Sequence, residues 1–299
     1  MTNKIILMYH SVSSEQVPSV LGSFPIPFER FQRQIKLIQQ AGYRFDFISN
    51  LHKDIPSHER VVYITGDDGT IDWTRNILPW CEKEKIPTHT GIITGVFEEP
   101  KVYPLTHLIQ IILITRDENE LSQLSKKIIN KYLTQEQLEY INQIYYYENL
   151  EYRRIIKGAF NLILESETIY KLIGKLSHQE DILINERFES LEFYKQFKYA
   201  QVGVHTRSHW ALDKDSQKYI KDEIISSKNI LEKSGLNLSK FFVSPMKPKH
   251  GASLKDIEQS LKELGFEGIL DSNFAIWNQR DYIIPRIDAK DVEGYFKDE

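Results

Sequence analysis

The sequence of 299 residues predicts an α/β fold built on a parallel sheet and interrupted by a long helical segment. Short apolar runs typical of buried strands alternate with amphipathic runs typical of helices up to about residue 98, and again after residue 200. Between these regions the chain shows helical spacing without strand-like alternation. We therefore expect a sheet domain formed by residues 1–99 and 199–299, with residues 100–198 as a helical insertion.

The first half of the sheet domain contains four apolar runs of strand length. They predict strands over residues 4–9, 43–48, 61–65 and 88–93. Helices are expected over residues 28–41, where apolar side chains recur at helical spacing up to Gly42, and over residues 72–85.

The alternation of strands and helices resumes after the insertion. Apolar runs predict strands over residues 201–204, 241–243, 268–270 and 282–284. Helices are expected over residues 215–234 and 253–264, and each is followed by a glycine suited to end it, Gly235 or Gly265.

Composition narrows the class of protein. A formal net charge of -4 provides no basic surplus to neutralise phosphates, so nucleic acid is not expected as the main partner. The single cysteine, Cys81, cannot form an internal disulfide and is interpreted as a buried, inert thiol. The N-terminal apolar run is too short for a secretory signal, and no run approaches the length of a transmembrane helix. A cytoplasmic protein is therefore expected.

The segment Thr65-Gly66-Asp67-Asp68-Gly69 follows a predicted buried strand. The carboxyl ends of parallel strands are where catalytic groups gather. Two adjacent buried acids are costly unless a cation offsets them, and a metal ion is one such cation. An Asp-Gly turn without a ligand remains the alternative on this signal alone.

A second polar segment, His205-Thr206-Arg207-Ser208-His209, also follows a predicted strand. A spacing of four residues lets both imidazoles face one point if the segment makes a helical turn. Two histidines and one carboxylate suit Zn²⁺ or a similar divalent ion and leave a position open for water. Alone, the histidine pair is a weak indication of a metal site.

Taken together and in this order, the two segments resemble the polysaccharide deacetylases, the NodB-homology group of carbohydrate esterase family 4. Three further stretches are similar to members of that family: residues 7–12, Ile77-Leu78-Pro79 with Ile86-Pro87-Thr88, and Arg286-Ile287. The resemblance covers residues 4–98 and 200–288. It implies a distorted (β/α) barrel with fewer strands than the usual eight, and metal-assisted hydrolysis of an N-acetyl amide.

The resemblance also implies a role for each matching residue. Asp67 corresponds to the general base and Asp68 to a metal ligand, with His205 and His209 as the other two ligands of a divalent metal, for which Zn²⁺ is expected. No histidine follows His250, so the late histidine that many members use as general acid is missing. We expect His10, which follows the first strand, to serve as the acid, with His250 as the alternative acid. A structural, hydrogen-bonded role for His10 remains the other interpretation.

Two positions depart from the family pattern. Gly66 stands where the family usually has a bulky aromatic residue, and the stretch from Val243 to Lys247 lacks the arginine that usually orients the base. Arg286 or Lys247 is expected to replace it. The other five histidines have no partner pattern and are interpreted as structural or surface residues: His52, His58, His89, His107 and His178.

The leading hypothesis is hydrolysis of an N-acetylated sugar or glycan precursor. Two alternatives remain open: an amide hydrolase acting on a non-sugar compound, and a non-catalytic carbohydrate-binding or assembly protein. The insertion is expected near the open end of the barrel, where it would influence the choice of substrate and not metal binding. The alternative is a distal decoration with no role in catalysis. The sequence leaves the oligomeric state open.

Overall fold

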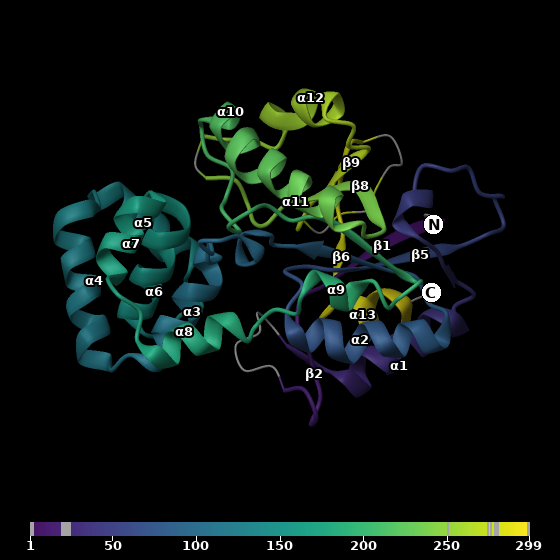
Figure 1. Ribbon diagram of the computed structural model, residues 1–299, viewed down its shortest axis with the longest axis horizontal. Coiled ribbons are helices and arrows are strands. Elements are labelled where there is room, and N and C mark those ends of the chain that lie inside the picture. The colour runs from purple at the N-terminus through teal and green to yellow at the C-terminus, as the bar shows by residue number, and fades with distance from the viewer. Residues whose placement is uncertain are drawn as a thin grey trace.

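The computed structural model describes residues 3–18, 25–249, 251–273, 275, 277 and 281–297. Its central feature is a sheet of nine strands in the order β10-β9-β8-β7-β6-β5-β1-β11, with β4 paired to β5 (Figure 1). Every pair in this sheet is parallel. The strands are β1 (Lys4–Tyr9), β4 (Arg44–Phe45), β5 (Val61–Gly66), β6 (Thr88–Ile92), β7 (Ala200–Val204), β8 (Leu238–Val243), β9 (Gly268–Leu270), β10 (Ile283–Ile284) and β11 (Ile287–Asp288).

The sheet curls into a half-barrel. Ile6 on β1 and Val243 on β8 belong to one buried cluster, although β5, β6 and β7 lie between those strands in the sheet. Such a contact requires the sheet to bend around its concave face. The neighbours of Ile6 in sequence, Ile5 and Leu7, belong to another cluster on the opposite face. Because both faces are covered, the strands read as continuous apolar runs.

Helices cover the convex face in two groups, below and above the sheet in Figure 1. One group shares a cluster with β1 and β5, and contains α1 (Phe28–Gln40), α2 (Ile71–Glu84) and α13 (Val292–Lys297). The other packs on β7 and β8, and contains α10 (Ser216–Tyr219), the π-helical turn η4 (Ile220–Ile225), α11 (Ser226–Ser234) and α12 (Lys255–Glu263). Smaller elements are β2 (Val12–Ser13), β3 (Ile26–Pro27), and the short helices η1 (Ile48–Asn50) and η2 (Gly95–Phe97).

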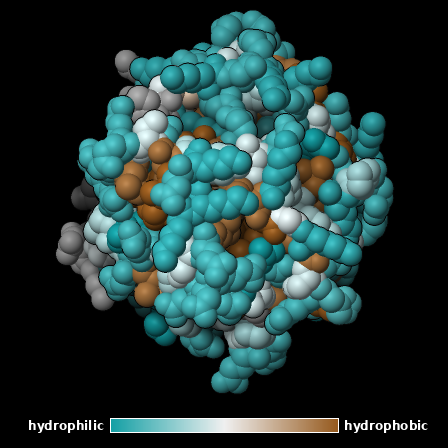
Figure 2. Space-filling view, turned by 90° about the vertical axis from the view of Figure 1, so that its left-hand side faces the viewer, coloured by the Kyte–Doolittle hydropathy of each residue, from teal (hydrophilic) through white to brown (hydrophobic). Residues whose placement is uncertain are grey.

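The chain between β6 and β7 is helical and projects to the left in Figure 1. Its elements are α3 (Leu105–Thr115), α4 (Glu118–Tyr132), α5 (Gln135–Ile144), α6 (Glu151–Gly158), the π-helical turn η3 (Ala159–Ile163), α7 (Ser166–Ile173), α8 (His178–Asn185) and α9 (Leu191–Tyr194). Ile128, Ile155 and Phe160 are fully buried between these helices. The outer face of this region is mostly hydrophilic, with scattered apolar side chains (Figure 2).

The predicted α/β barrel is confirmed, and most strands and helices lie within a few residues of their predicted positions. The strand predicted over residues 43–48 is wrong in length, because only Arg44 and Phe45 pair with β5 before η1 begins. The resemblance implied fewer than eight strands, but the sheet has nine, which are the eight predicted from the sequence and β11. Cys81 is buried as predicted. Among the described helices, none has both the length and the apolar character needed to span a membrane.

Candidate metal centre

Two loops at one edge of the sheet carry the residues singled out from the sequence. Asp67 and Asp68 follow β5, and His205 follows β7. Only β6 separates these strands, and both pairings are parallel. The two loops therefore leave from carboxyl ends that face the same way, which brings their side chains together.

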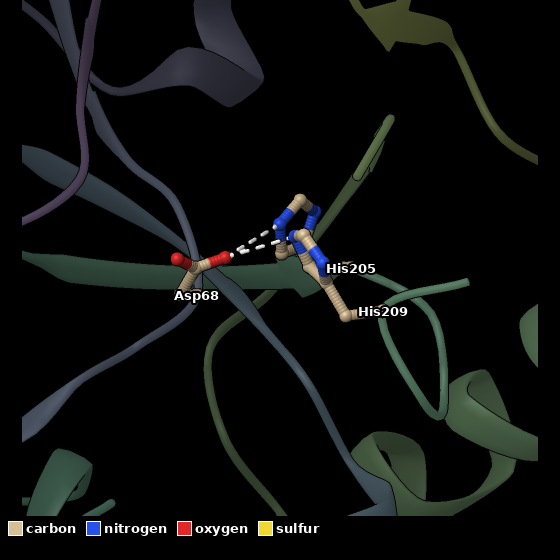
Figure 3. Close-up of side chains that lie close together, drawn as sticks. All are labelled: Asp68, His205 and His209. Carbon is tan, nitrogen blue, oxygen red and sulfur yellow. Dashed lines mark hydrogen bonds and ion pairs between the residues drawn. The ribbon is translucent and has the colours of Figure 1, made fainter. Parts of the chain in front are cut away.

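Asp68, His205 and His209 converge on one point (Figure 3). The Nε2 atoms of His205 and His209 lie 3.2 and 3.1 Å from Oδ1 of Asp68. Ligand atoms placed about 2.0–2.1 Å from a tetrahedral Zn²⁺ are separated from one another by about 3.3 Å. All three side chains are buried. The spacing of the three atoms therefore suits one metal ion.

The hydrogen bonds of His205 favour a cation at this point. Its Nδ1 lies 2.9 Å from the carbonyl oxygen of Val243, and because a carbonyl only accepts, Nδ1 carries the proton. The Nε2 atom of a neutral His205 then directs a lone pair toward the carboxylate of Asp68. Two lone pairs facing each other in a buried site are stabilised by a positive ion between them. The residues present thus fit a divalent metal.

The carboxylate of Asp68 is held in its ionised form. Burial alone would raise its pKa, but the neighbouring imidazoles of His209 and His107 outweigh burial and hold the pKa well below its usual range. An ionised carboxylate is the form that binds a metal.

Asp67, the neighbour of Asp68, is paired with Arg286. The guanidinium donates hydrogen bonds of 2.6 and 2.7 Å to the two carboxylate oxygens. Burial alone would raise the pKa of Asp67, but the charge and hydrogen bonds of Arg286 reverse this and lower it. Nε2 of His10 lies 3.9 Å from Oδ2 of Asp67, and the His10 side chain is about 25% exposed. A buried base candidate and a solvent-accessible histidine therefore lie beside the candidate metal ligands.

No family model matches the sequence, and no curated protein matches it. Solved structures match it in fold. IcaB from Ammonifex degensii is 16% identical with a TM-score of 0.56, over 98% of this chain and 95% of that one. A de-N-acetylase from Aggregatibacter actinomycetemcomitans is 12% identical with a TM-score of 0.54, over 98% and 99%. The deacetylase PplD from Streptococcus pyogenes, in complex with acetate, is 16% identical with a TM-score of 0.52, over 95% and 91%. The chain has the polysaccharide-deacetylase fold.

Within this deacetylase fold, the backbone at the site is strained. Asp68, Thr206 and His209 have φ angles of 71°, 66° and 56°, in the left-handed region that side chains other than glycine rarely adopt. Glu223 on η4 holds the histidine loop, because its Oε2 accepts hydrogen bonds of 3.0 and 2.8 Å from the backbone N–H groups of Arg207 and Ser208. Nothing in the sequence marks Glu223 as a partner of this loop.

The departure at Gly66 has a structural reason. A Cβ atom at this position would lie 2.2 Å from Cε2 of Trp73, a separation that real atoms do not adopt. Trp73, on α2, is fully buried beside Gly66 and donates a 2.9 Å hydrogen bond to Thr90. An aromatic ring thus lies beside the site, but it comes from the following helix and not from position 66.

Arg286 and Lys247 were the two expected replacements for the family's arginine. Arg286 is fully buried against Asp67, whereas Lys247 is exposed. Of the two, Arg286 is the residue that pairs with Asp67. His250, the alternative acid, lies outside the described residues.

His107 was not singled out by the sequence, because it has no motif partner. The structure places it at 1% exposure, with Nε2 3.4 Å from Oδ2 of Asp68. Burial and the charge of Arg187 lower the pKa of His107 to about 3. The available signal was a lone histidine in α3, a helix in which most of the other residues are apolar. Of the four remaining histidines, His89 is buried and three are exposed: His52, His58 and His178.

Proposed function

We propose that this chain is a metal-dependent deacetylase that hydrolyses the N-acetyl amide of a sugar or glycan precursor. The observation that carries the proposal is that a candidate metal site and an oriented carboxylate lie side by side at one edge of the sheet. Asp68, His205 and His209 form a candidate metal site, and the adjacent Asp67 is ionised and oriented by Arg286.

The donor set suggests the metal. Two imidazole nitrogens and one carboxylate oxygen are ligands that Zn²⁺ commonly accepts, and three protein ligands leave a position for water or substrate. A divalent ion bound there would polarise the acyl carbonyl and make the attacking water more acidic.

Asp67 is proposed as the general base. Its two oxygens accept hydrogen bonds from Arg286, which fixes the plane of the carboxylate and keeps it ionised at neutral pH. An ionised carboxylate next to a metal ligand can accept the proton of an attacking water. Arg286 is itself held by Thr65 Oγ1 and the carbonyl of Asp271 at 2.9 and 3.0 Å.

His10 is proposed as the general acid. It follows β1, which lies between β5 and β11, so it emerges at the same edge as Asp67. The side chain is about 25% exposed, so a substrate can approach it from solvent. Protonation of the departing amine is required because an amide anion is a very poor leaving group.

The substrate class is inferred from relatives of the same fold. One solved relative is named a de-N-acetylase, and another is a deacetylase with bound acetate. Likeness of fold alone does not determine a substrate, so the sugar part of the proposal depends on this analogy. The amide part is also supported by the arrangement of Asp67, His10 and the candidate metal ligands.

The test is acetate release by the zinc-loaded protein from two panels of compounds. One panel contains N-acetylated hexosamines, their oligomers and their nucleotide-linked forms, and the other contains N-acetylated amino acids and amines. We expect release from the sugar panel, with loss of release after chelation and recovery after zinc is restored. Asp68→Asn, which removes a ligand, is the matched negative control.

Two results contradict the proposal. Release from the amine panel alone would show a non-sugar amide hydrolase. A protein that binds one zinc ion per chain but releases no acetate from either panel would support the non-catalytic alternative.

A further inference from the structure

Helix α3 touches the candidate metal centre at two adjacent residues. Thr106 places Oγ1 3.0 Å from Nδ1 of His209. The next residue, His107, places Nε2 3.4 Å from Oδ2 of Asp68. Two of the three candidate ligands thus have a partner on the first helix of the chain between β6 and β7.

The carboxylate of Asp68 divides its two oxygens between different neighbours. Oδ1 faces the Nε2 atoms of His205 and His209, while Oδ2 faces His107. Rotation of the carboxylate would move Oδ1 away from the two histidines and would break the contact with His107. A donor at Oδ2 therefore favours the orientation in which Oδ1 is presented to the metal.

Arg187 determines which nitrogen of His107 carries the proton. Its Nε donates to Nδ1 of His107, and a guanidinium can only donate. Nδ1 must therefore accept, which places the single proton of the imidazole on Nε2, the atom that faces Asp68. Arg187 is buried and also donates a 3.1 Å hydrogen bond to Gln110, one turn along α3 from His107.

The same segments are tied to the backbone of both ligand loops. The N–H of Leu105 donates to the carbonyl of Ser208, next to His209, at 3.2 Å. The N–H of Ile71, three residues after Asp68, donates to the carbonyl of Arg187 at 2.8 Å. The ring of Phe188 packs on His107 with centroids 5.3 Å apart. These contacts fix His107 and Arg187 relative to the ligands.

We propose that His107 is a positioning residue of the metal centre, which orients Asp68 for the metal and has its tautomer set by Arg187. The inference rests on the proposed metal site and is independent of the sugar substrate. It replaces the expectation that the region between β6 and β7 affects only the choice of substrate.

The experiment measures the zinc dissociation constant of the full chain by competition with a chelating dye. The variants are His107→Leu, His107→Gln and His107→Asn, with Arg187→Met as a fourth. The glutamine amide nitrogen reaches the position of Nε2, whereas the shorter asparagine does not, so this pair separates the donor from polarity alone. His178→Leu, at an exposed position on α8, is the matched control. Far-ultraviolet circular dichroism of each metal-free variant reports whether it folds.

Loss of a partner of a metal ligand typically weakens metal binding about 10–100-fold. We expect this loss for His107→Leu and His107→Asn, a near wild-type constant for His107→Gln, and an intermediate value for Arg187→Met. The visible spectrum of the cobalt-substituted protein should change in the same order. If His107→Leu does not fold, the comparison of glutamine with asparagine decides.

Two failures are distinguishable. Wild-type zinc affinity in a folded His107→Leu, or equal affinity in the glutamine and asparagine variants, overturns the role of His107. If Asp68→Asn and His205→Ala also bind zinc as the wild type does, the proposed metal site itself is wrong.

Discussion

Arg286 forms a bidentate ion pair with Asp67, with N–O distances of 2.6 and 2.7 Å, although the two residues are 219 positions apart in the sequence. Arg286 immediately precedes β11 and Asp67 follows β5, and only β1 lies between these two strands in the sheet. The pair joins the end of the chain to the candidate base.

Removal of Arg286 should lower the free energy of unfolding. In Arg286→Met the carboxylate of Asp67 stays buried without its partner, and breaking a buried pair costs about 3–5 kcal/mol of unfolding free energy. Urea unfolding would measure the loss. The matched control is Arg30→Met, which breaks a similar bidentate ion pair with Glu293 that is partly exposed to solvent. A surface pair is worth about 1 kcal/mol or less. Equal losses in both variants would contradict the role given to burial.

Asp67→Asn should separate base chemistry from metal binding. The substitution keeps the size of the side chain but removes the proton acceptor, so we expect kcat for acetate release to fall about 10²–10⁴-fold. Zinc content, measured by atomic emission, should stay at the wild-type value, because Asp67 is not among the candidate ligands. Asp68→Asn should instead lower the zinc content, and acetate release should fall as a consequence. Full activity of Asp67→Asn would assign the base to another group.

His10→Gln should discriminate between substrates by their leaving groups. An amide needs its departing nitrogen protonated, whereas an activated aryl acetate ester releases a stable phenolate without an acid. We expect the variant to lose at least about 100-fold in kcat/KM on the amide. Less than tenfold should be lost on the ester by the same argument. Equal losses on both compounds would indicate that His10 binds or orients substrate and is not the acid.

Gly66→Ala should destabilise the fold by crowding Trp73. The added methyl group would lie 2.2 Å from Cε2 of the fully buried indole, which must shift. Overpacking of this kind costs about 1–3 kcal/mol, measurable by urea unfolding. The control is Gly294→Ala in α13, where nothing lies within 4 Å of the new atom and alanine favours the helix. A Gly66→Ala variant as stable as the control would show that Trp73 is free to move.

His89 should make stability depend on pH below neutrality. Burial lowers its pKa from 6.5 to about 3 in the folded protein. As pH falls below 6.5, the unfolded chain takes up a proton that the folded chain does not, so stability is lost by up to about 1.4 kcal/mol per pH unit. His89→Gln, which can keep the contact with Ser239, should show a shallower decline between pH 7 and 5. Urea unfolding at several pH values checks this, and parallel curves would contradict it.

The sequence alone predicted the class of fold and the two loops that carry the candidate site residues. Alternating apolar and amphipathic runs are local signals, and they placed β1, β5, β6 and β7 closely because both faces of each strand are buried. Asp67, Asp68, His205 and His209 were singled out because they follow predicted strands and because the two segments, in this order, resemble the polysaccharide deacetylases. The two-residue strands β2 and β11 were not predicted, since so short a strand carries no periodic pattern.

Only the tertiary structure decided which distant residues complete the site. The choice of Arg286 over Lys247 depends on how the sheet curls to bring β11 beside β1, and no spacing in the sequence records that curvature. His107 and Arg187 lie 39 and 119 residues after Asp68, on a helical region whose sequence shows only that it is helical. Their meeting with Asp68 depends on packing between segments, which is a property of the folded chain and has no local signature.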